Sequence, residues 1–150
     1  HTILMALDAV AAACLTGQFR GVCSEYEIGF LRHRVLGAFK SVDLFLVVPD
    51  EDCRRAGSFF PNATQLVCIP DRPFTAPEEA YIANGPKGCY DPPAFVLQHR
   101  LIHRCGQLVR QRMQAGAKYK WVLRMRADVL WHRFPGPKQL EAMEAEGSTP

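Results

Sequence analysis

Three charged residues gather at the end of one predicted strand in the second half of the chain. Arg124, Arg126 and Asp128 alternate along the segment Arg124-Met-Arg-Ala-Asp128, directly after an apolar run. A carboxylate at a strand end is a hard ligand for Mn²⁺ or Mg²⁺, and a metal held there would bind a diphosphate. The arginine side chains present planar sets of donors that suit phosphate oxygens. The alternative is a structural salt bridge between Asp128 and one of the arginines.

A second candidate site follows the first predicted strand, at Thr16, Gly17, Gln18 and Arg20. A glycine at a strand end allows the backbone to approach a ligand closely, and Arg20 could reach a phosphate. No Gly-Lys-Ser/Thr follows Gly17, so the segment is not a P-loop and a Walker-type NTPase is excluded. An ordinary turn from strand to helix would explain the same residues.

Two histidines, His99 and His103, stand four residues apart on a predicted helix, which is the spacing of two metal ligands on one helical face. The residues between them are Arg-Leu-Ile, so the glutamate of a zinc-protease helix is missing. Arg100 and Arg104 beside them would repel a cation. We therefore favour a solvated or phosphate-facing surface, with both arginines pointing to solvent or toward the site.

The charge distribution is uneven although the net charge is only +3. Ten Lys/Arg and one acid, Asp128, lie between Pro93 and Lys138. These charges are spread over a helix, a strand and a turn, without a recognition motif or an array of stacking aromatic residues, so we expect no nucleic-acid partner. No apolar run approaches the roughly 20 residues that span a bilayer, so no transmembrane segment is expected.

Apolar runs alternate with helical patterns along the chain. We predict strands at 10–16, 42–48, 65–69 and 119–125, with a short fifth at 129–131, and helices at 24–39, 93–115 and 137–147. Ser24 and Glu27 form a capping box for the first helix, whose Ile28, Leu31, Val35 and Phe39 face the core. A short polar turn or helix is expected at 50–55.

Residues 70–92 are predicted to form a long Pro/Gly-rich loop, because five prolines leave no periodicity there. The helix that follows is the strongest of the chain. Its predicted apolar stripe, which packs on the sheet, consists of Ile102, Cys105, Val109 and Met113.

This order of elements predicts an α/β fold with a mostly parallel, Rossmann-like sheet flanked by helices. In such sheets ligands bind beyond the carboxyl ends of the strands. The first and fourth strands should be parallel in one sheet, and Gly17 and Asp128 should then lie on the same edge. We expect the 150 residues to form a single domain and to be a fragment of a longer protein, because the chain begins with His1 and not with Met.

The six cysteines contain no CxxC pair and no usual zinc spacing. Three lie in apolar segments and are predicted to be buried thiols, and three lie in predicted loops, where they would pair in a secretory compartment. The first set is Cys14, Cys68 and Cys105, and the second is Cys23, Cys53 and Cys89. Asn62-Ala63-Thr64 is a sequon for N-glycosylation, which would also suit a secretory lumen.

Two segments together resemble poorly characterised glycosyltransferase-like proteins of the GT-A, nucleotide-diphospho-sugar transferase fold. The first is Leu-Thr-Gly-Gln-Phe-Arg, followed by a helix and Val-Asp-Leu-Phe-Leu-Val-Val, and the second is Tyr-Lys-Trp-Val-Leu-Arg-Met-Arg-Ala-Asp. The second segment is the more specific. The likeness covers roughly residues 10–48 and 95–134. It implies that the chain is the N-terminal part of an incomplete GT-A domain.

The resemblance implies transfer of a sugar from a nucleotide-sugar donor to a glycan, lipid or protein acceptor. Asp128 then corresponds to the acid of the Asp-x-Asp metal motif, while Arg126 stands where that motif has its first acid. Donor binding is carried over to Thr16, Gly17, Gln18, Arg20, Arg124, Arg126 and Asp128, and no catalytic base is assigned. The full-length parent would lie in the secretory pathway, in the Golgi lumen. A module that binds a nucleotide or an anionic glycan without turnover is the alternative.

Overall fold

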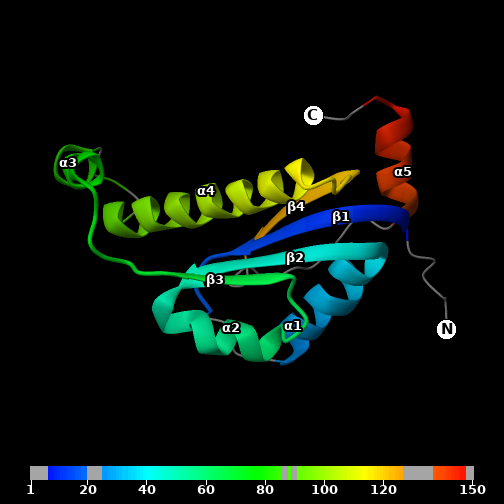
Figure 1. Ribbon diagram of the computed structural model, residues 1–150, viewed down its shortest axis with the longest axis horizontal. Coiled ribbons are helices and arrows are strands. Elements are labelled where there is room, and N and C mark those ends of the chain that lie inside the picture. The colour runs from blue at the N-terminus through cyan, green and yellow to red at the C-terminus, as the bar shows by residue number, and fades with distance from the viewer. Residues whose placement is uncertain (1–6, 20–24, 86–87, 89–90, 127–136, 148–150) are drawn as a thin grey trace.

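The computed structural model has a four-stranded parallel sheet with helices on both faces (Figure 1). It describes residues 7–19, 25–85, 88, 91–126 and 137–147. The strands are β1 (Leu7–Thr16), β2 (Phe39–Pro49), β3 (Gln65–Ile69) and β4 (Trp121–Arg126). Their order in the sheet is β3-β2-β1-β4. The predicted α/β, Rossmann-like class is therefore confirmed.

The central strand is β1, which pairs in parallel with β2 on one side and β4 on the other. The prediction that the first and fourth strands are parallel members of one sheet is thus confirmed. Ala11, Ala12 and Ala13 of β1 are fully buried. Small side chains suit this strand, because helices cover both faces of the sheet there.

One face is covered by α1 (Glu25–Phe30), its irregular continuation through Ala38, and α2 (Cys53–Phe59). Ile28, Leu31 and Val35 are buried against the sheet as predicted. Phe39 is also buried, but as the first residue of β2 and not as the end of the helix. Ser24 of the predicted capping box lies outside the described residues. The polar segment after β2 is a short 3-10 turn at Asp50–Asp52 that continues as α2.

The other face is covered by the long helix α4 (Pro92–Gln114), in agreement with the predicted helix. The predicted stripe is wrong at two of its four positions, since Ile102 is only partly buried and Met113 is 48% exposed. The helix lies rotated from the predicted orientation because a row of leucines faces the sheet. The buried residues of α4 are Leu97, Leu101, Cys105, Leu108 and Val109.

The predicted loop at 70–92 is also wrong, because α3 (Ala76–Asn84) lies within it. Thr75 caps this helix: its hydroxyl accepts from the Glu78 N–H, and the Glu78 carboxylate accepts from the Thr75 N–H. Pro77 falls in the first turn, where proline is tolerated because the missing N–H has no partner in the helix. The prolines therefore mark the start of a helix and not its absence.

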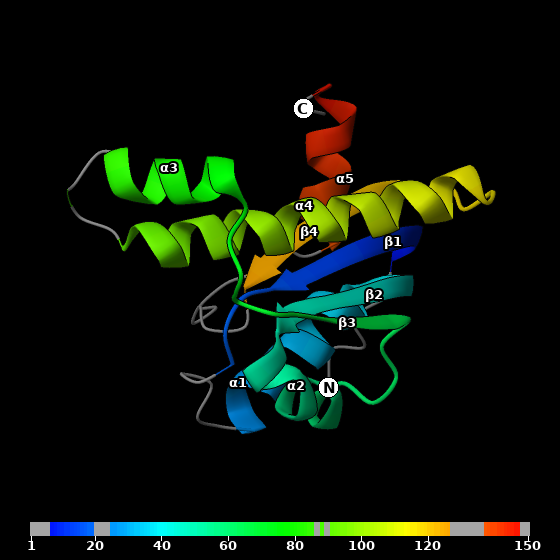
Figure 2. The same cartoon turned by 60° about the vertical axis from the view of Figure 1, so that its left-hand side comes forward.

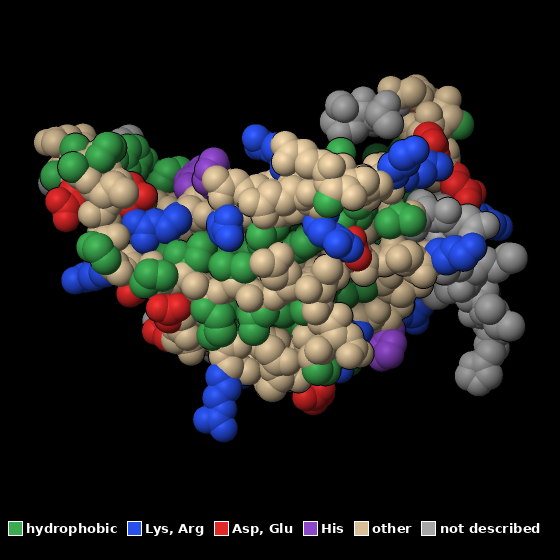
Figure 3. Space-filling model, in the orientation of Figure 1, with side chains coloured by type: hydrophobic (Ala, Val, Ile, Leu, Met, Phe, Trp, Pro, Cys, Tyr) green, Lys and Arg blue, Asp and Glu red, His purple; other side chains and the backbone are tan. Residues whose placement is uncertain are grey.

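Helix α3 lies alongside α4, and both extend beyond the carboxyl ends of the strands (Figure 2). Hydrophobic side chains gather over α3 on the face shown in Figure 3. None of the residues of α3 is buried, so this helix adds little to the core.

The last helix, α5 (Pro137–Ala145), lies near the start of β1 (Figure 1). Its Leu140 is buried with Ala11 and Phe39, and Glu144 pairs with Lys120 at 2.6 Å. The predicted fifth strand at 129–131 lies outside the described residues. No helix of the described part is long and apolar enough to cross a bilayer.

Two disulfides join elements that are distant in the sequence. Cys14 of β1 is bonded to Cys105 of α4, and Cys53 of α2 to Cys68 of β3, with Cα–Cα distances of 6.0 and 5.7 Å. The prediction of free thiols at Cys14, Cys68 and Cys105 is therefore wrong. An apolar setting does not distinguish a buried thiol from a half-cystine, because both are small and hydrophobic.

Candidate functional site

The strand order places a switch point between β1 and β4. The chain leaves β1 toward β2 and β3 on one side, and returns through α4 to β4 on the other. In open α/β sheets the carboxyl edge at such a point is where ligands bind, because the two crossovers diverge there. Both segments that the sequence singled out, at Thr16 and at Arg126, end at this edge.

The strand register puts Arg126 opposite Thr16 and Arg124 opposite Cys14. Cys14 is bonded to Cys105 of α4, so all four residues belong to the face of the sheet that α4 covers. Thr16 is fully buried, and its Oγ1 accepts a hydrogen bond of 3.3 Å from Nε2 of Gln98. This bond fixes α4 to the end of β1.

A cavity of about 230 Å³ opens between these strand ends and the first half of α4. Arg126 supplies a cation, Asp91 a carboxylate, and Gln18 and Gln98 supply amides. The remaining lining is apolar and includes Phe95, which is 40% exposed. The lining residues are Gln18, Asp91, Ala94, Phe95, Leu97, Gln98, Leu101 and Arg126.

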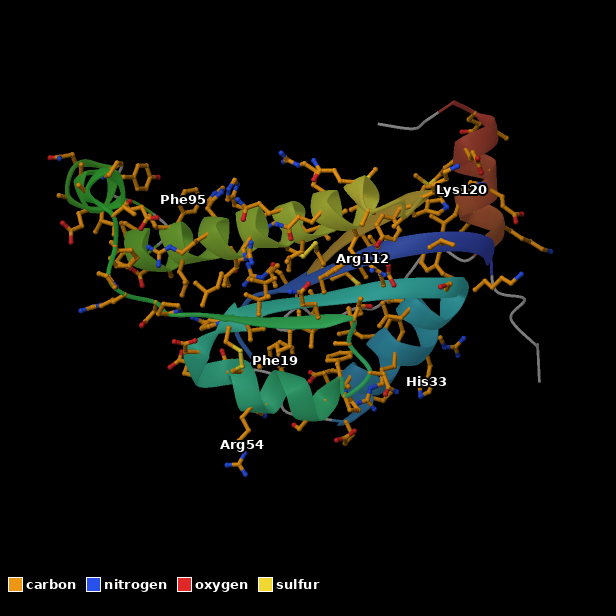
Figure 4. The ribbon with its side chains drawn as sticks, viewed as in Figure 1. Phe19, His33, Arg54, Phe95, Arg112 and Lys120 are labelled. Atoms are coloured by element: carbon orange, nitrogen blue, oxygen red, sulfur yellow. A yellow bond between two sulfur atoms is a disulfide. The ribbon has the colours of Figure 1, made fainter. Side chains whose placement is uncertain are left out.

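The turn after β1 has a conformation that glycine favours. Gly17 has a φ of 111° and is buried, and the chain then enters the core at Phe19. The Phe19 ring lies between the sheet and α2 (Figure 4), with its centroid 6.3 Å from that of Phe59 and 6.4 Å from that of Phe60. The buried Phe19 side chain thus anchors the turn on the α2 side of the sheet, while the preceding residue, Gln18, lines the cavity.

The N-terminus of α4 supplies few donors to the cavity. Pro92 and Pro93 occupy its first two positions and have no N–H, and the Phe95 N–H already bonds to the Asp91 carbonyl at 3.0 Å. Any anion bound here would therefore depend on side chains more than on the helix terminus.

Arg100 does not point to solvent or to the cavity, contrary to the prediction. Its guanidinium donates to the carbonyls of Pro70 and Pro73 at 3.1 and 3.3 Å, forms an ion pair with Glu78, and lies over the Phe74 ring. Arg100 therefore attaches the connection after β3, and α3 with it, to α4.

The pair His99 and His103 makes separate contacts along α4. The His99 ring packs edge-on against Phe95 with centroids 4.3 Å apart, and His103 is 3.1 Å from the Gln107 amide. Phe95 is also stacked with Tyr81 of α3 at 6.0 Å, and lies on the side of α4 nearest α3 (Figure 4). These contacts form an aromatic seam between the two helices.

The predicted site residues are thus placed unequally. Thr16, Gly17, Gln18 and Arg126 lie at the cavity or next to it. Arg124 is not part of the cavity lining, and it lies two residues before Arg126 on β4. Arg20 and Asp128 lie outside the described residues. Sequence reasoning missed Asp91, Phe95 and Gln98, which only the packing of α4 brings to the strand ends.

The described residues do not fit a divalent cation. Among the described residues that line the cavity, Asp91 is the only carboxylate, and Arg126 lies in the same lining. Across the described ranges no group of three or more His, Cys, Asp and Glu side chains is placed to hold a metal. A metal site would therefore require ligands from residues such as Asp128.

Comparisons of the chain with protein-family models, with curated protein sequences and with solved structures find no match.

Proposed function

We propose that the chain binds a nucleoside-diphosphate sugar in the cavity at the switch point and acts in sugar transfer. The mixed lining of that cavity carries the proposal, since a cation, a carboxylate, two amides and an exposed ring converge there. A site for inorganic phosphate needs only cations and N–H donors. A nucleotide sugar also has hydroxyls and a flat base, which the other groups suit.

Each lining group then has a role set by its chemistry. The Arg126 guanidinium binds the diphosphate through charge-assisted hydrogen bonds. Asp91 accepts hydrogen bonds from sugar hydroxyls, and Phe95 packs against a flat ring of the ligand. Gln98 holds the end of β1 in place through Thr16, so it acts as a positioning residue.

In this proposal the Arg126 guanidinium offsets part of the negative charge of the diphosphate. Arg126 occupies the position where a metal motif has its first acid, and it faces the cavity. A contribution from Mn²⁺ or Mg²⁺ at Asp128 is a separate expectation, which the same experiment tests. The proposed acceptor is the hydroxyl of a glycan, lipid or protein.

The experiment is a calorimetric titration with uridine, guanosine and cytidine diphospho-sugars, each with and without Mn²⁺. Release of the free nucleotide is measured in parallel with acceptors of the three classes. Saturable binding together with acceptor-dependent release supports a transferase. Binding without release in the full-length protein supports the alternative of a non-catalytic module. Failure of every diphospho-sugar to bind contradicts the transferase and a nucleotide-binding module alike.

A further inference from the structure

The sequon Asn62-Ala63-Thr64 forms a tight turn between α2 and β3. The Ala63 N–H donates to the Phe60 carbonyl at 3.1 Å, which places Pro61 and Asn62 at the two central positions. Proline and asparagine are both favoured in turns, for their fixed φ and short polar side chain respectively. Asn62 is exposed, so its amide is accessible at the tip.

The hydroxyl residue of the sequon keeps this turn at the start of β3. Thr64 Oγ1 accepts a hydrogen bond of 3.0 Å from the Leu44 N–H, and the Thr64 N–H donates to the Leu44 carbonyl at 2.8 Å. Serine carries the same hydroxyl, so it would preserve both the fold contact and the sequon. The turn is therefore ordered by backbone hydrogen bonds and by the Thr64 hydroxyl, and none of these bonds uses the Asn62 side chain.

The two disulfides indicate the compartment in which this chain folds. Cys14–Cys105 connects a strand to a helix inside the core, and Cys53–Cys68 connects a helix to a strand at partly buried positions. Structural disulfides of this kind persist in oxidising environments such as the lumen of the secretory pathway. N-linked glycans are attached in that pathway, so the sequon and the disulfides point to the same environment by independent observations.

We infer that Asn62 is an acceptor of an N-linked glycan. The co-reactant is an oligosaccharide joined through a diphosphate to a polyprenol lipid. The bond between sugar C1 and the diphosphate oxygen breaks, and the lipid diphosphate leaves with the electron pair. A bond forms between C1 and Asn62 Nδ2. Nδ2 loses one proton to the separate enzyme that transfers the oligosaccharide.

The position of Asn62 leaves the candidate donor site open. The turn precedes β3, so it lies at the amino edge of the parallel sheet, opposite to the carboxyl edge that carries Thr16 and Arg126 (Figure 1). Asn62 also borders a mainly apolar hollow of about 320 Å³ with Leu36, Val42 and Phe60 in its lining. The apolar face of the first sugar can pack there, so we expect the glycan to raise the melting temperature.

The test is import of the chain into microsomes behind a cleavable secretory leader, with a C-terminal tag that carries its own sequon. Only chains with a glycosylated tag are scored, which restricts the readout to translocated protein. Asn62→Gln removes the proposed acceptor. Asn84→Gln is the matched control, because Asn84 is the one other asparagine and lies outside a sequon. Thr64→Ser keeps the sequon.

We expect one glycan beyond that of the tag on wild type, Asn84→Gln and Thr64→Ser, removable by an N-glycanase, and none on Asn62→Gln. Digestion of the same protein without reduction should yield a peptide that contains the Cys53–Cys68 disulfide. Trimming the glycan on Asn62 to its first sugar should retain most of the rise in melting temperature, because only that sugar packs in the hollow. Wild-type protein with a modified tag and an unmodified Asn62 would overturn the inference, as would a second glycan on Asn62→Gln.

Discussion

At the scale of single residues, the proposed donor binding depends most on the side chain of Arg126. Arg126→Gln should weaken the binding of a nucleoside diphosphate by about tenfold or more, because a hydrogen bond to a charged group contributes about 1.5–3 kcal/mol. Arg110→Gln is the control, since it removes an exposed charge about 18 Å along α4 from Gln98. Titration calorimetry measures both. Equal losses in the two variants would show that only the overall charge matters.

Gly17 tests whether the turn after β1 requires its observed conformation. Gly17→Ala should lower the free energy of unfolding by about 1–3 kcal/mol, because a side chain strains the backbone at a φ of 111°. Gly106 lies within α4 with nothing within 4 Å of an added Cβ. Gly106→Ala should therefore raise the free energy of unfolding by about 0.5–1 kcal/mol. Urea denaturation measures both changes, and a neutral Gly17→Ala would contradict the assigned turn.

At the scale of elements, the pairing of α3 with α4 should depend on pH through Glu78. Its hydrogen bond with Arg100 lowers the pKa of the Glu78 carboxyl below the ordinary value of 4.5, and the Thr75 N–H adds to this shift. A lowered pKa in the folded state means that the ion pair stabilises the protein above the ordinary carboxyl pKa. This contribution, below about 1 kcal/mol for such a partly exposed pair, is lost as the pH falls through the folded-state pKa.

Amide hydrogen exchange measures this effect directly in α3. We expect protection of the α3 amides to fall below about pH 4.5, while the amides of β1 stay protected. Glu78→Gln should show the weaker protection at neutral pH as well, and Glu79→Gln should behave as wild type. Protection of α3 that does not change with pH would show that contacts other than the Glu78–Arg100 pair hold the helix, such as the Tyr81–Phe95 stacking.

The limits of sequence reasoning also appear at this scale. The apolar runs of all four strands predicted the sheet, and the signal is continuous in β1 and β2 because these inner strands are buried on both faces. The capping box at Thr75 and Glu78 was available in the sequence, yet five nearby prolines obscured it. Only part of the candidate site could be predicted from the sequence. Thr16, Gly17, Gln18 and Arg126 were predicted because they lie at the ends of strands. The positions of Asp91, Phe95 and Gln98 at the cavity depend on how α4 is rotated about its axis over the sheet. The amphipathic periodicity of the helix predicted that rotation incorrectly.

At the scale of the whole molecule, the two disulfides should contribute unequally to stability. They close loops with sequence separations of 91 and 15 residues, and the longer loop restricts the unfolded chain more. In the chain-entropy treatment the expected losses are about 4.5 and 3 kcal/mol. Replacing Cys14 and Cys105 together by alanine should therefore lower the melting temperature more than replacing Cys53 and Cys68. The reverse order by calorimetry would contradict this account.

The central claim is that a nucleotide sugar binds at the carboxyl edge between β1 and β4. Backbone chemical shifts recorded during a titration of the ¹⁵N-labelled protein with a nucleoside diphosphate and its sugar conjugate test this most directly. We expect the largest changes at Thr16, Gly17, Gln18, Gln98 and Arg126, with additional changes at Phe95 for the conjugate. The turn at Asn62, on the opposite edge, should not change. Shifts that concentrate at that opposite edge, or no saturable shift at any residue, would contradict the account.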